Sequence, residues 1–154
     1  MKLQVSTSLA LYSVLEFVAN GEHQTSAADI AAKYKVSTHH LAKVLRELVR
    51  AGMIESTRGV GGGYRFSGNA KRLTLMDIIG LFEDIGDRAG RNRQPGGSTD
   101  VGRALAAVLG EIDEIAKATF RSITVGTMLK LIERQRSRAA EEKKQVLPKK
   151  GRRR

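Results

Sequence analysis

Residues 53–66, which read MIESTRGVGGGYRF, decide the fold. The first six of them, residues 53–58, predict a short strand, and residues 64–66 predict a second one. The five residues between the strands include four glycines and predict no regular structure. Two short strands joined by a glycine-rich turn predict a β-hairpin.

Helices precede this hairpin. Ser26 and Asp29 form a capping box at the start of a short helix. Ser37 is the expected N-cap of the next helix, which runs from about residue 38 to residue 51. A longer first helix is expected over residues 8–20. The helix after Ser37 has one apolar stripe, made of Leu41, Val44, Leu45 and Leu48.

The order helix, turn, helix, hairpin is that of a winged helix–turn–helix, so the expected fold class is mostly α with a small β-hairpin. A helix with one apolar face and one face rich in hydrogen-bond donors fits the major groove of DNA. Its N-terminal dipole also favours a phosphate. A slim turn with an arginine on each side suits close approach to the DNA backbone or minor groove. The candidate DNA-binding residues are Ser26, Ser37, Thr38, His39, His40, Lys43, Arg46, Arg58, Gly59, Gly61, Gly62, Gly63, Tyr64 and Arg65.

The charge distribution also indicates a polyanionic partner. The net charge is +11 over 154 residues. Ten basic and two acidic residues lie from Arg134 onward, so much of this charge is C-terminal. In the rest of the chain, residues 33–72 carry nine basic and two acidic residues. That stretch contains the expected recognition helix and hairpin, whereas a merely solvated surface would spread its charges more evenly.

The C-terminal half predicts a dimer. Thr74 and Asp77 form a second capping box, which opens a helix that ends around residue 84. From residue 101, apolar residues recur at spacings of four and three over nearly three heptads, which is typical of a helix that pairs with a second copy. Burial of this stripe against its own domain is the alternative. The residues of this dimer seam are Val101, Leu105, Val108, Ile112, Ile115 and Thr119.

Four segments are therefore expected. Residues 1–84 form the DNA-binding domain, residues 85–100 a glycine-rich loop, residues 101–134 the dimerisation helix and a short helix, and residues 135–154 a basic, disordered tail. The chain has no run of apolar residues long enough for a transmembrane helix. Its N-terminus does not resemble a signal peptide, so no membrane partner and a cytoplasmic location are expected.

The wing sequence then points to a family. Residues 58–65, RGVGGGYR, resemble the R-G-x-G-G-G-Y wing of the IscR/NsrR/CymR family of bacterial winged-helix transcription regulators. The register agrees around it, because residues 30–37 resemble the family's turn and residues 41–52 its recognition helix. Residues 123–126 are similar to the start of its last helix. The resemblance covers roughly residues 1–132 and implies a homodimer that reads a pseudo-palindrome in double-stranded DNA.

The chain departs from the family in one respect. Family members that sense iron–sulfur status or nitric oxide carry three cysteines near the start of the long helix, and this chain has none. A thiolate-bound iron–sulfur cluster is thereby excluded, and no cofactor is expected. Natural absence of the cysteines is favoured over their replacement. The loop over residues 86–100, beside the acidic Glu83, Asp84 and Asp87, is then a candidate surface for a regulatory protein partner or a small-molecule effector.

Other interpretations are weaker. The glycine run superficially resembles a nucleotide-binding loop, but a strand follows it instead of a helix. A plain flexible turn explains only some of its glycines. His39 and His40 point about 100° apart on a helix, which makes them a poor pair of metal ligands. No nucleophile, base and oxyanion site can be assembled, so an enzyme is not expected. A non-specific DNA binder driven by the basic tail remains an alternative.

Two substitutions test the DNA-binding hypothesis. Arg65→Ala is expected to weaken specific binding by about 1–3 kcal/mol, measured at fixed salt. A change of His40 is expected to alter sequence preference, which a comparison of specific with random DNA measures.

Overall fold

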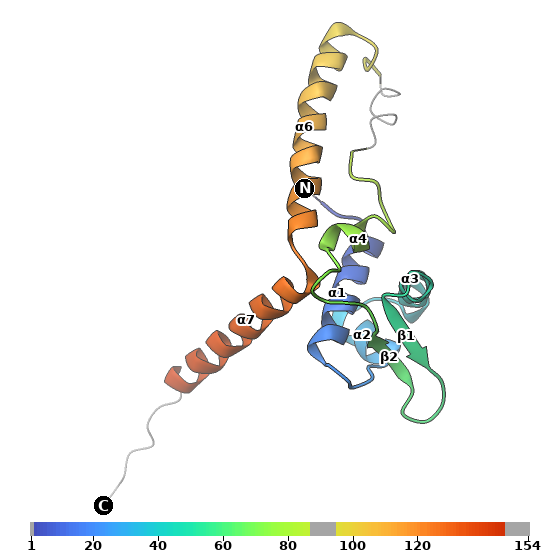
Figure 1. The fold of residues 1–154 in the computed structure, drawn as a ribbon, viewed down its shortest axis with the longest axis vertical. Coiled ribbons are helices and arrows are strands. Elements are labelled where there is room, and N and C mark those ends of the chain that lie inside the picture. Colours follow the sequence, from blue (N-terminus) through green and yellow to red (C-terminus); the bar gives the residue numbers. More distant parts are fainter. Residues whose placement is uncertain (1, 87–94, 147–154) are drawn as a thin grey trace, which may run out of the picture.

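The computed structural model describes residues 2–86 and 95–146. Figure 1 shows a body formed by the N-terminal half, from which two long helices extend in different directions. The helices and the antiparallel hairpin confirm the expected fold class. In chain order the elements are α1 (Val5–Ala19), α2 (Ala27–Tyr34), α3 (Thr38–Arg50), β1 (Ile54–Thr57), β2 (Gly63–Phe66), α4 (Leu75–Ile79), α6 (Asp100–Ser122) and α7 (Val125–Val146).

Side-chain caps begin both helices of the helix–turn–helix, as predicted. Ser26 Oγ accepts the backbone N–H of Asp29 at 3.1 Å, and Ser37 Oγ accepts that of His40 at 3.1 Å. The Ser26 hydroxyl also donates to Asp29 Oδ2 at 2.7 Å. Lys35 ends α2 in a left-handed conformation, with φ of 52°. This turn sends the chain from α2 into α3.

The apolar stripe of α3 lies at the centre of the core. Leu41, Leu45 and Leu48 are fully buried in one cluster with Phe17 of α1 and Ile54 of β1. Full burial of a leucine or phenylalanine side chain contributes roughly 1.5–3 kcal/mol. The cluster therefore holds the apolar side of α3 against the body and leaves the opposite side of the helix outward.

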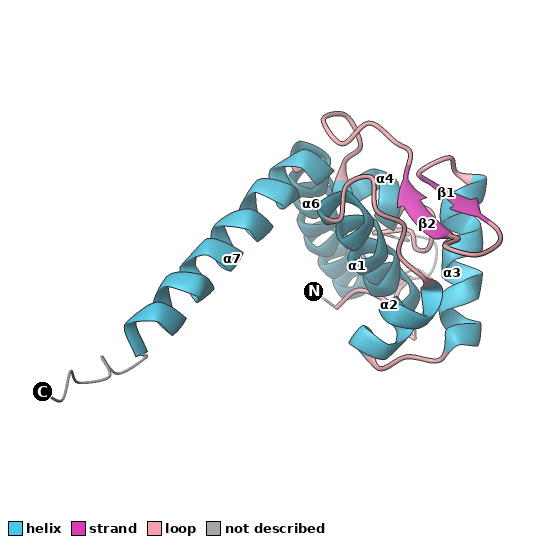
Figure 2. Cartoon of the chain, turned by 90° about the horizontal axis from the view of Figure 1, so that it is seen from below, coloured by secondary structure: helices cyan, strands magenta, loops and turns pink. Residues whose placement is uncertain are grey.

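The hairpin is joined to the body by a backbone bridge between Thr25 and Tyr64. In β1 and β2, Ile54 lies opposite Phe66 and Glu55 lies opposite Arg65. Thr25, just before α2, exchanges backbone hydrogen bonds of 2.9 and 3.0 Å with Tyr64. The hairpin therefore has a fixed place beside α3 (Figure 2).

The junction between the two long helices is also fixed to the body. The predicted capping box of Thr74 and Asp77 is complete and starts α4. The next residue, Leu75, donates its backbone N–H to the Ile123 carbonyl at 2.9 Å, and Val125 donates to the Leu73 carbonyl at 2.8 Å. Because these bonds flank the α6–α7 turn, both helices leave the body from one anchored point.

Three boundaries differ from the sequence-based expectation. The first helix begins at Val5 instead of residue 8, and α4 ends at Ile79 instead of near residue 84. The largest correction is α7, which continues to Val146 where a disordered tail was predicted from residue 135. That stretch is rich in alanine, glutamate, lysine and arginine and has no proline or glycine, which favours a helix. Residues 87–94 of the expected loop and 147–154 of the tail lie outside the described residues.

Candidate DNA-binding surface

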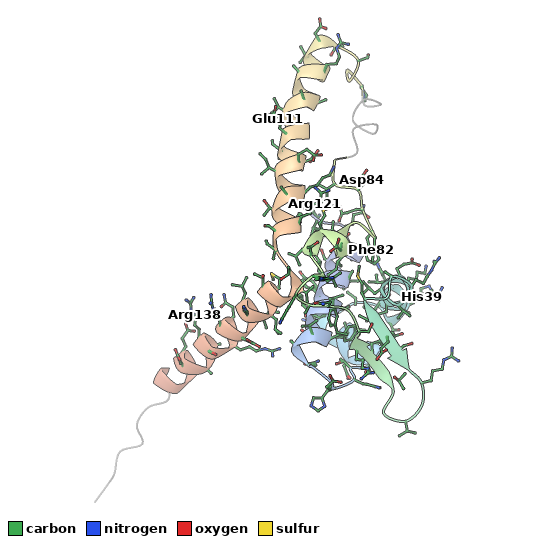
Figure 3. The ribbon with its side chains drawn as sticks, in the orientation of Figure 1. His39, Phe82, Asp84, Glu111, Arg121 and Arg138 are labelled. Carbon is green, nitrogen blue, oxygen red and sulfur yellow. The ribbon has the colours of Figure 1, made fainter. Side chains whose placement is uncertain are left out.

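The outward side of α3 carries polar and basic side chains. Thr38 and His39, at the N-terminus of the helix, are exposed, and so are Lys43 and Arg46 farther along it. Figure 3 shows His39 at the edge of the body, on the outer side of α3. A helix that presents donors in this way, with free backbone N–H groups at its first turn, has the properties needed for contacts to bases and phosphates.

His40 differs from its neighbour. Its side chain is half-buried, and its Nε2 atom lies 3.0 Å from Ser6 Oγ of α1. This hydrogen bond joins the start of the recognition helix to the start of α1. The predicted base-reading role of His40 therefore competes with a structural contact, whereas the exposed His39 has no such tie among the described residues. Sequence patterns give no sign of this contact, because Ser6 is 34 residues away.

The two wing arginines have different surroundings. Arg58 is exposed at the tip and forms no ion pair with any residue that the structure describes. Arg65, on β2, is paired with Glu55 across the hairpin, and its Nη1 atom lies 3.3 Å from Glu22 Oε2. The guanidinium of Arg65 is therefore shared between two carboxylates on the surface that was expected to face DNA.

The glycines of the wing are required by its backbone. Gly59 and Gly61 have φ of 102° and 76°, a region that other residues rarely adopt. A Cβ atom on Gly62 would lie 2.4 Å from the Thr57 carbonyl oxygen. One on Gly63 would lie 2.8 Å from the carbonyl oxygen of Thr25. The hairpin itself therefore accounts for all four glycines, which together keep its tip slim.

Three other predicted DNA-binding residues serve the fold. Ser26 caps α2. Tyr64 is half-buried, and its ring stacks on Phe17 with the ring centroids 6.1 Å apart. Ser37 likewise caps α3, so its side-chain oxygen already accepts a backbone N–H. We call α2, α3 and the hairpin together the reading head. The structure places Thr38, His39, Lys43, Arg46 and Arg58 on its outside, whereas Ser26, Ser37 and Tyr64 hold its elements in place.

The predicted dimer seam lies exposed along α6. Its apolar residues are 54% to 78% exposed, far more than any apolar residue in the core: Val101, Leu105, Val108, Ile112 and Ile115. Thr119 is exposed too, and its hydroxyl donates to the Ile115 carbonyl at 2.9 Å. The base of the helix is fixed from its other side, because Ala116 and Phe120 contact Leu75 and Ile79. Burial within the chain, the alternative for this stripe, is therefore wrong.

The donor set for metals is limited. The sequence contains no cysteine, so thiolate ligands are not present anywhere in the chain. Across residues 2–86 and 95–146, no group of three or more histidine, aspartate or glutamate side chains is arranged to hold a metal ion. Neither long helix, nor any other helix in those two ranges, has the length and apolar character needed to cross a bilayer.

Comparisons with known proteins agree with this geometry. Residues 3–131 match the family Rrf2, described as iron-dependent transcriptional regulators. Over 138 residues the chain is 56% identical to BadM of Rhodopseudomonas palustris, named as an HTH-type transcriptional regulator, and the match covers 88% of this chain and 86% of that protein. It is 35% identical over 85 residues to the HTH-type transcriptional regulator NsrR of Geobacillus kaustophilus, which covers 54% of this chain and 58% of that one.

A solved structure shares the architecture. CymR, the global cysteine regulator of B. subtilis, is similar with a TM-score of 0.69 at 25% identity. The superposition covers 85% of this chain and 98% of CymR. The family match, the match to BadM and the similarity to CymR each extend beyond the winged helix into the long helices.

Proposed function

Because the chain belongs to the Rrf2 family of DNA-binding transcriptional regulators, we propose that it works as a homodimer that reads a pseudo-palindromic operator. Thr38, His39 and Lys43 of α3 contact base edges in the major groove, and Arg58 of the wing contacts the backbone or minor groove. Its named relatives are regulators, so a role as an enzyme is not part of this proposal.

The observation that carries the proposal is the shared direction of α3 and the wing. Burial of Leu41, Leu45 and Leu48 turns the polar side of α3 outward, and the pairing of Thr25 with Tyr64 places the hairpin beside it. The exposed cations Lys43, Arg46 and Arg58 belong to these two elements. Phosphate contacts from such cations position a protein on DNA, and contacts from α3 supply the sequence preference.

The homodimer rests on α6. A row of large apolar side chains that are more than half exposed is unfavourable on a monomer, because removing apolar area from water lowers the free energy. The heptad-like spacing of this row suits a twofold contact in which the same surface of each copy is buried. Two copies joined in this way present two reading heads, which matches the symmetry of a palindromic site.

We further propose that regulation does not use a thiolate-bound iron–sulfur cluster. The family description includes iron dependence, but a cluster needs thiolate ligands and this chain has no cysteine. The residues present do not fit that group. Regulation is therefore assigned to a different ligand or partner, and no step is derived through iron.

Selection from a randomised duplex pool tests the function. The full chain is incubated with the pool at low and at physiological salt, the bound fraction is sequenced, and affinity is measured by fluorescence anisotropy. The expected result is an enriched palindrome that persists at physiological salt. Binding without enrichment, or binding that disappears as salt rises, would instead support a non-specific DNA-coating protein.

A further inference from the structure

A cavity opens on the side of the body away from the DNA-reading helix. It has a volume of about 350 Å³ and lies between α1, α2 and α7. Figures 1 and 2 place α7 and α3 on opposite sides of α1. The volume is at the small end of the range for small-molecule pockets. It is lined by side chains from the consecutive helices α1 and α2 and from α7, which is distant from both in sequence.

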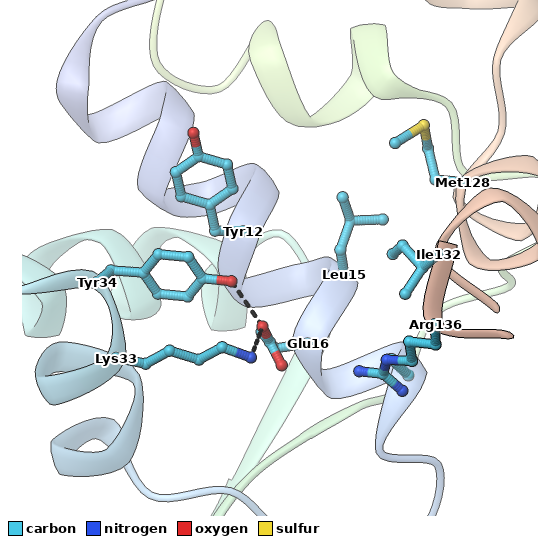
Figure 4. A pocket seen from close by; sticks show the side chains of 9 residues that line it. Tyr12, Leu15, Glu16, Lys33, Tyr34, Met128, Ile132 and Arg136 are labelled. Carbon is cyan, nitrogen blue, oxygen red and sulfur yellow. Dashed lines mark hydrogen bonds and ion pairs between the residues drawn. The ribbon is translucent and has the colours of Figure 1, made fainter. Parts of the chain in front are cut away.

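One half of the cavity is polar and carries a net positive charge. Glu16 of α1 is mostly buried. Its carboxylate accepts a hydrogen bond of 2.6 Å from the Tyr34 hydroxyl and forms an ion pair with Lys33 (Figure 4). Arg136 of α7 lines the same space but has no hydrogen bond or ion pair with any described residue. Two cations thus face a single carboxylate, which leaves one positive charge uncompensated.

The charges in this half influence one another. Burial alone would favour the neutral form of Glu16, but the hydrogen bonds from Lys33 and Tyr34 and the charge of Arg136 outweigh it and lower the pKa of the carboxyl. Burial and the bond to Glu16 raise the pKa of Tyr34. At neutral pH, Glu16 is therefore ionised and Tyr34 is protonated, so the charge balance of the cavity holds.

The other half of the cavity is apolar. Leu15 of α1 faces Met128 and Ile132 of α7 across the space (Figure 4). Beside them the rings of Tyr12 and Tyr34 are stacked, with centroids 4.8 Å apart and planes within 9°. Aliphatic and aromatic walls of this kind accommodate a small apolar body and exclude a strongly hydrated ion.

We propose that this cavity binds a small organic monoanion, an apolar body that carries one carboxylate, and that this ligand controls the regulator. The carboxylate pairs with Arg136, whose guanidinium suits bidentate contact with such a group. The apolar body lies against Leu15, Met128, Ile132 and the edge of the tyrosine pair. A ligand of single negative charge neutralises the remaining positive charge, whereas an inorganic anion leaves the apolar walls uncovered.

The position of the cavity gives such a ligand a route to the DNA-reading heads. Its walls belong partly to α1 and α2 of the winged helix and partly to α7, which directly follows the dimer helix α6. A ligand that favours one placement of α7 against α1 thereby changes the relative orientation of the two reading heads in a dimer. This control role rests on the proposed function, whereas binding to the cavity does not.

Calorimetry on the full chain tests binding. The probes are 3-phenylpropionate and hexanoate, with neutral 3-phenylpropionamide as the uncharged match. We expect the carboxylates to bind and the amide to bind at least about tenfold more weakly, because it lacks the charge-assisted bond. Arg136→Gln should weaken carboxylate binding by about tenfold or more. Arg138→Gln is the matched control, because Arg138 lies on the same helix outside the cavity (Figure 3).

Several outcomes would overturn the proposal. Absence of carboxylate binding, equal binding of the amide, or equal losses in the two arginine variants each would do so. A change of oligomeric state in Arg136→Gln without ligand would mean that a second copy occupies the cavity instead. Circular dichroism is the control that checks whether both variants fold.

The control role has its own measurement. Operator affinity with and without saturating carboxylate is expected to differ at least about fivefold, the lower end of ordinary allosteric coupling. Equal affinities, with binding proven by calorimetry, would overturn the control role only. Failure to bind any DNA sequence would overturn the proposed function and leave the binding site standing.

Discussion

Within the wing, two arginines of the same expected role differ in what surrounds them. Arg58 has no carboxylate partner in the described parts of the chain, and Arg65 is shared between Glu55 and Glu22. At a phosphate, Arg65 would therefore have its charge already partly compensated, whereas Arg58 would bring its whole charge to the DNA.

We expect Arg58→Ala to weaken operator binding by about 1–3 kcal/mol. Arg65→Ala should weaken operator binding less than Arg58→Ala does. Part of its loss should come from the missing contact to DNA, and part from Glu55, which is left uncompensated near the phosphates. The double variant Glu55→Gln with Arg65→Ala is then expected to recover part of the loss. Anisotropy at fixed salt measures all three, and a double variant as weak as Arg65→Ala would assign Arg65 to direct contact.

The adjacent histidines provide a second test at the residue scale. His39 is exposed at the start of α3, whereas His40 contacts Ser6. We expect His39→Ala to change the bases selected from a random pool, because its ring is free to reach base edges. His40→Ala should change the selected bases less. If His40→Ala shifts the selected sequence more than His39→Ala, the original expectation for His40 is supported.

At the scale of the hairpin, shape depends on close approach of backbones. We expect Gly63→Ala to destabilise the protein by about 1–3 kcal/mol, because the new Cβ would meet the Thr25 carbonyl at 2.8 Å. Chemical denaturation measures the change. Val60→Ala, at the fully exposed tip, is the control and should leave stability unchanged. If Gly63→Ala is as stable as the unmodified chain, the close approach of the hairpin to Thr25 does not contribute to stability.

The long helix α6 carries the dimer prediction. Ile112→Asp places a charge in the middle of the exposed apolar row. We therefore expect light scattering to show a dimer for the unmodified chain and a monomer for this variant at the same concentration. Ala107→Asp adds the same charge to the same helix outside the row and serves as control. A dimer that survives Ile112→Asp but not Ala107→Asp would place the interface on another face.

At the scale of the whole molecule, the charge is divided between the reading heads and the C-terminal end. Residues 147–154 contain five of the basic residues. Their removal is expected to lower affinity at low salt and to reduce the slope of log affinity against log salt, with the selected sequence unchanged. Anisotropy over a salt series measures this. Loss of the selected palindrome after this removal would support the tail-driven alternative.

Local sequence patterns are sufficient to predict the fold class, the caps at Ser26, Ser37 and Thr74, the hairpin and the apolar row on α6. These follow from local signals, namely the spacing of apolar residues, hydrogen bonds three residues apart and a glycine-rich turn. The extension of α7 to Val146 is not among these features, because the basic composition of residues 135–146 predicts disorder, although most of their residue types are good helix formers.

Which side chains are free depends on tertiary contacts. The contact of His40 with Ser6, the pairing of Arg65 with Glu22 and the cavity formed by α1, α2 and α7 each join residues far apart in the chain. Such contacts depend on how whole helices are oriented by their buried faces. The spacing of residues along the chain does not reveal that orientation. The wing motif alone therefore cannot distinguish the free Arg58 from the paired Arg65.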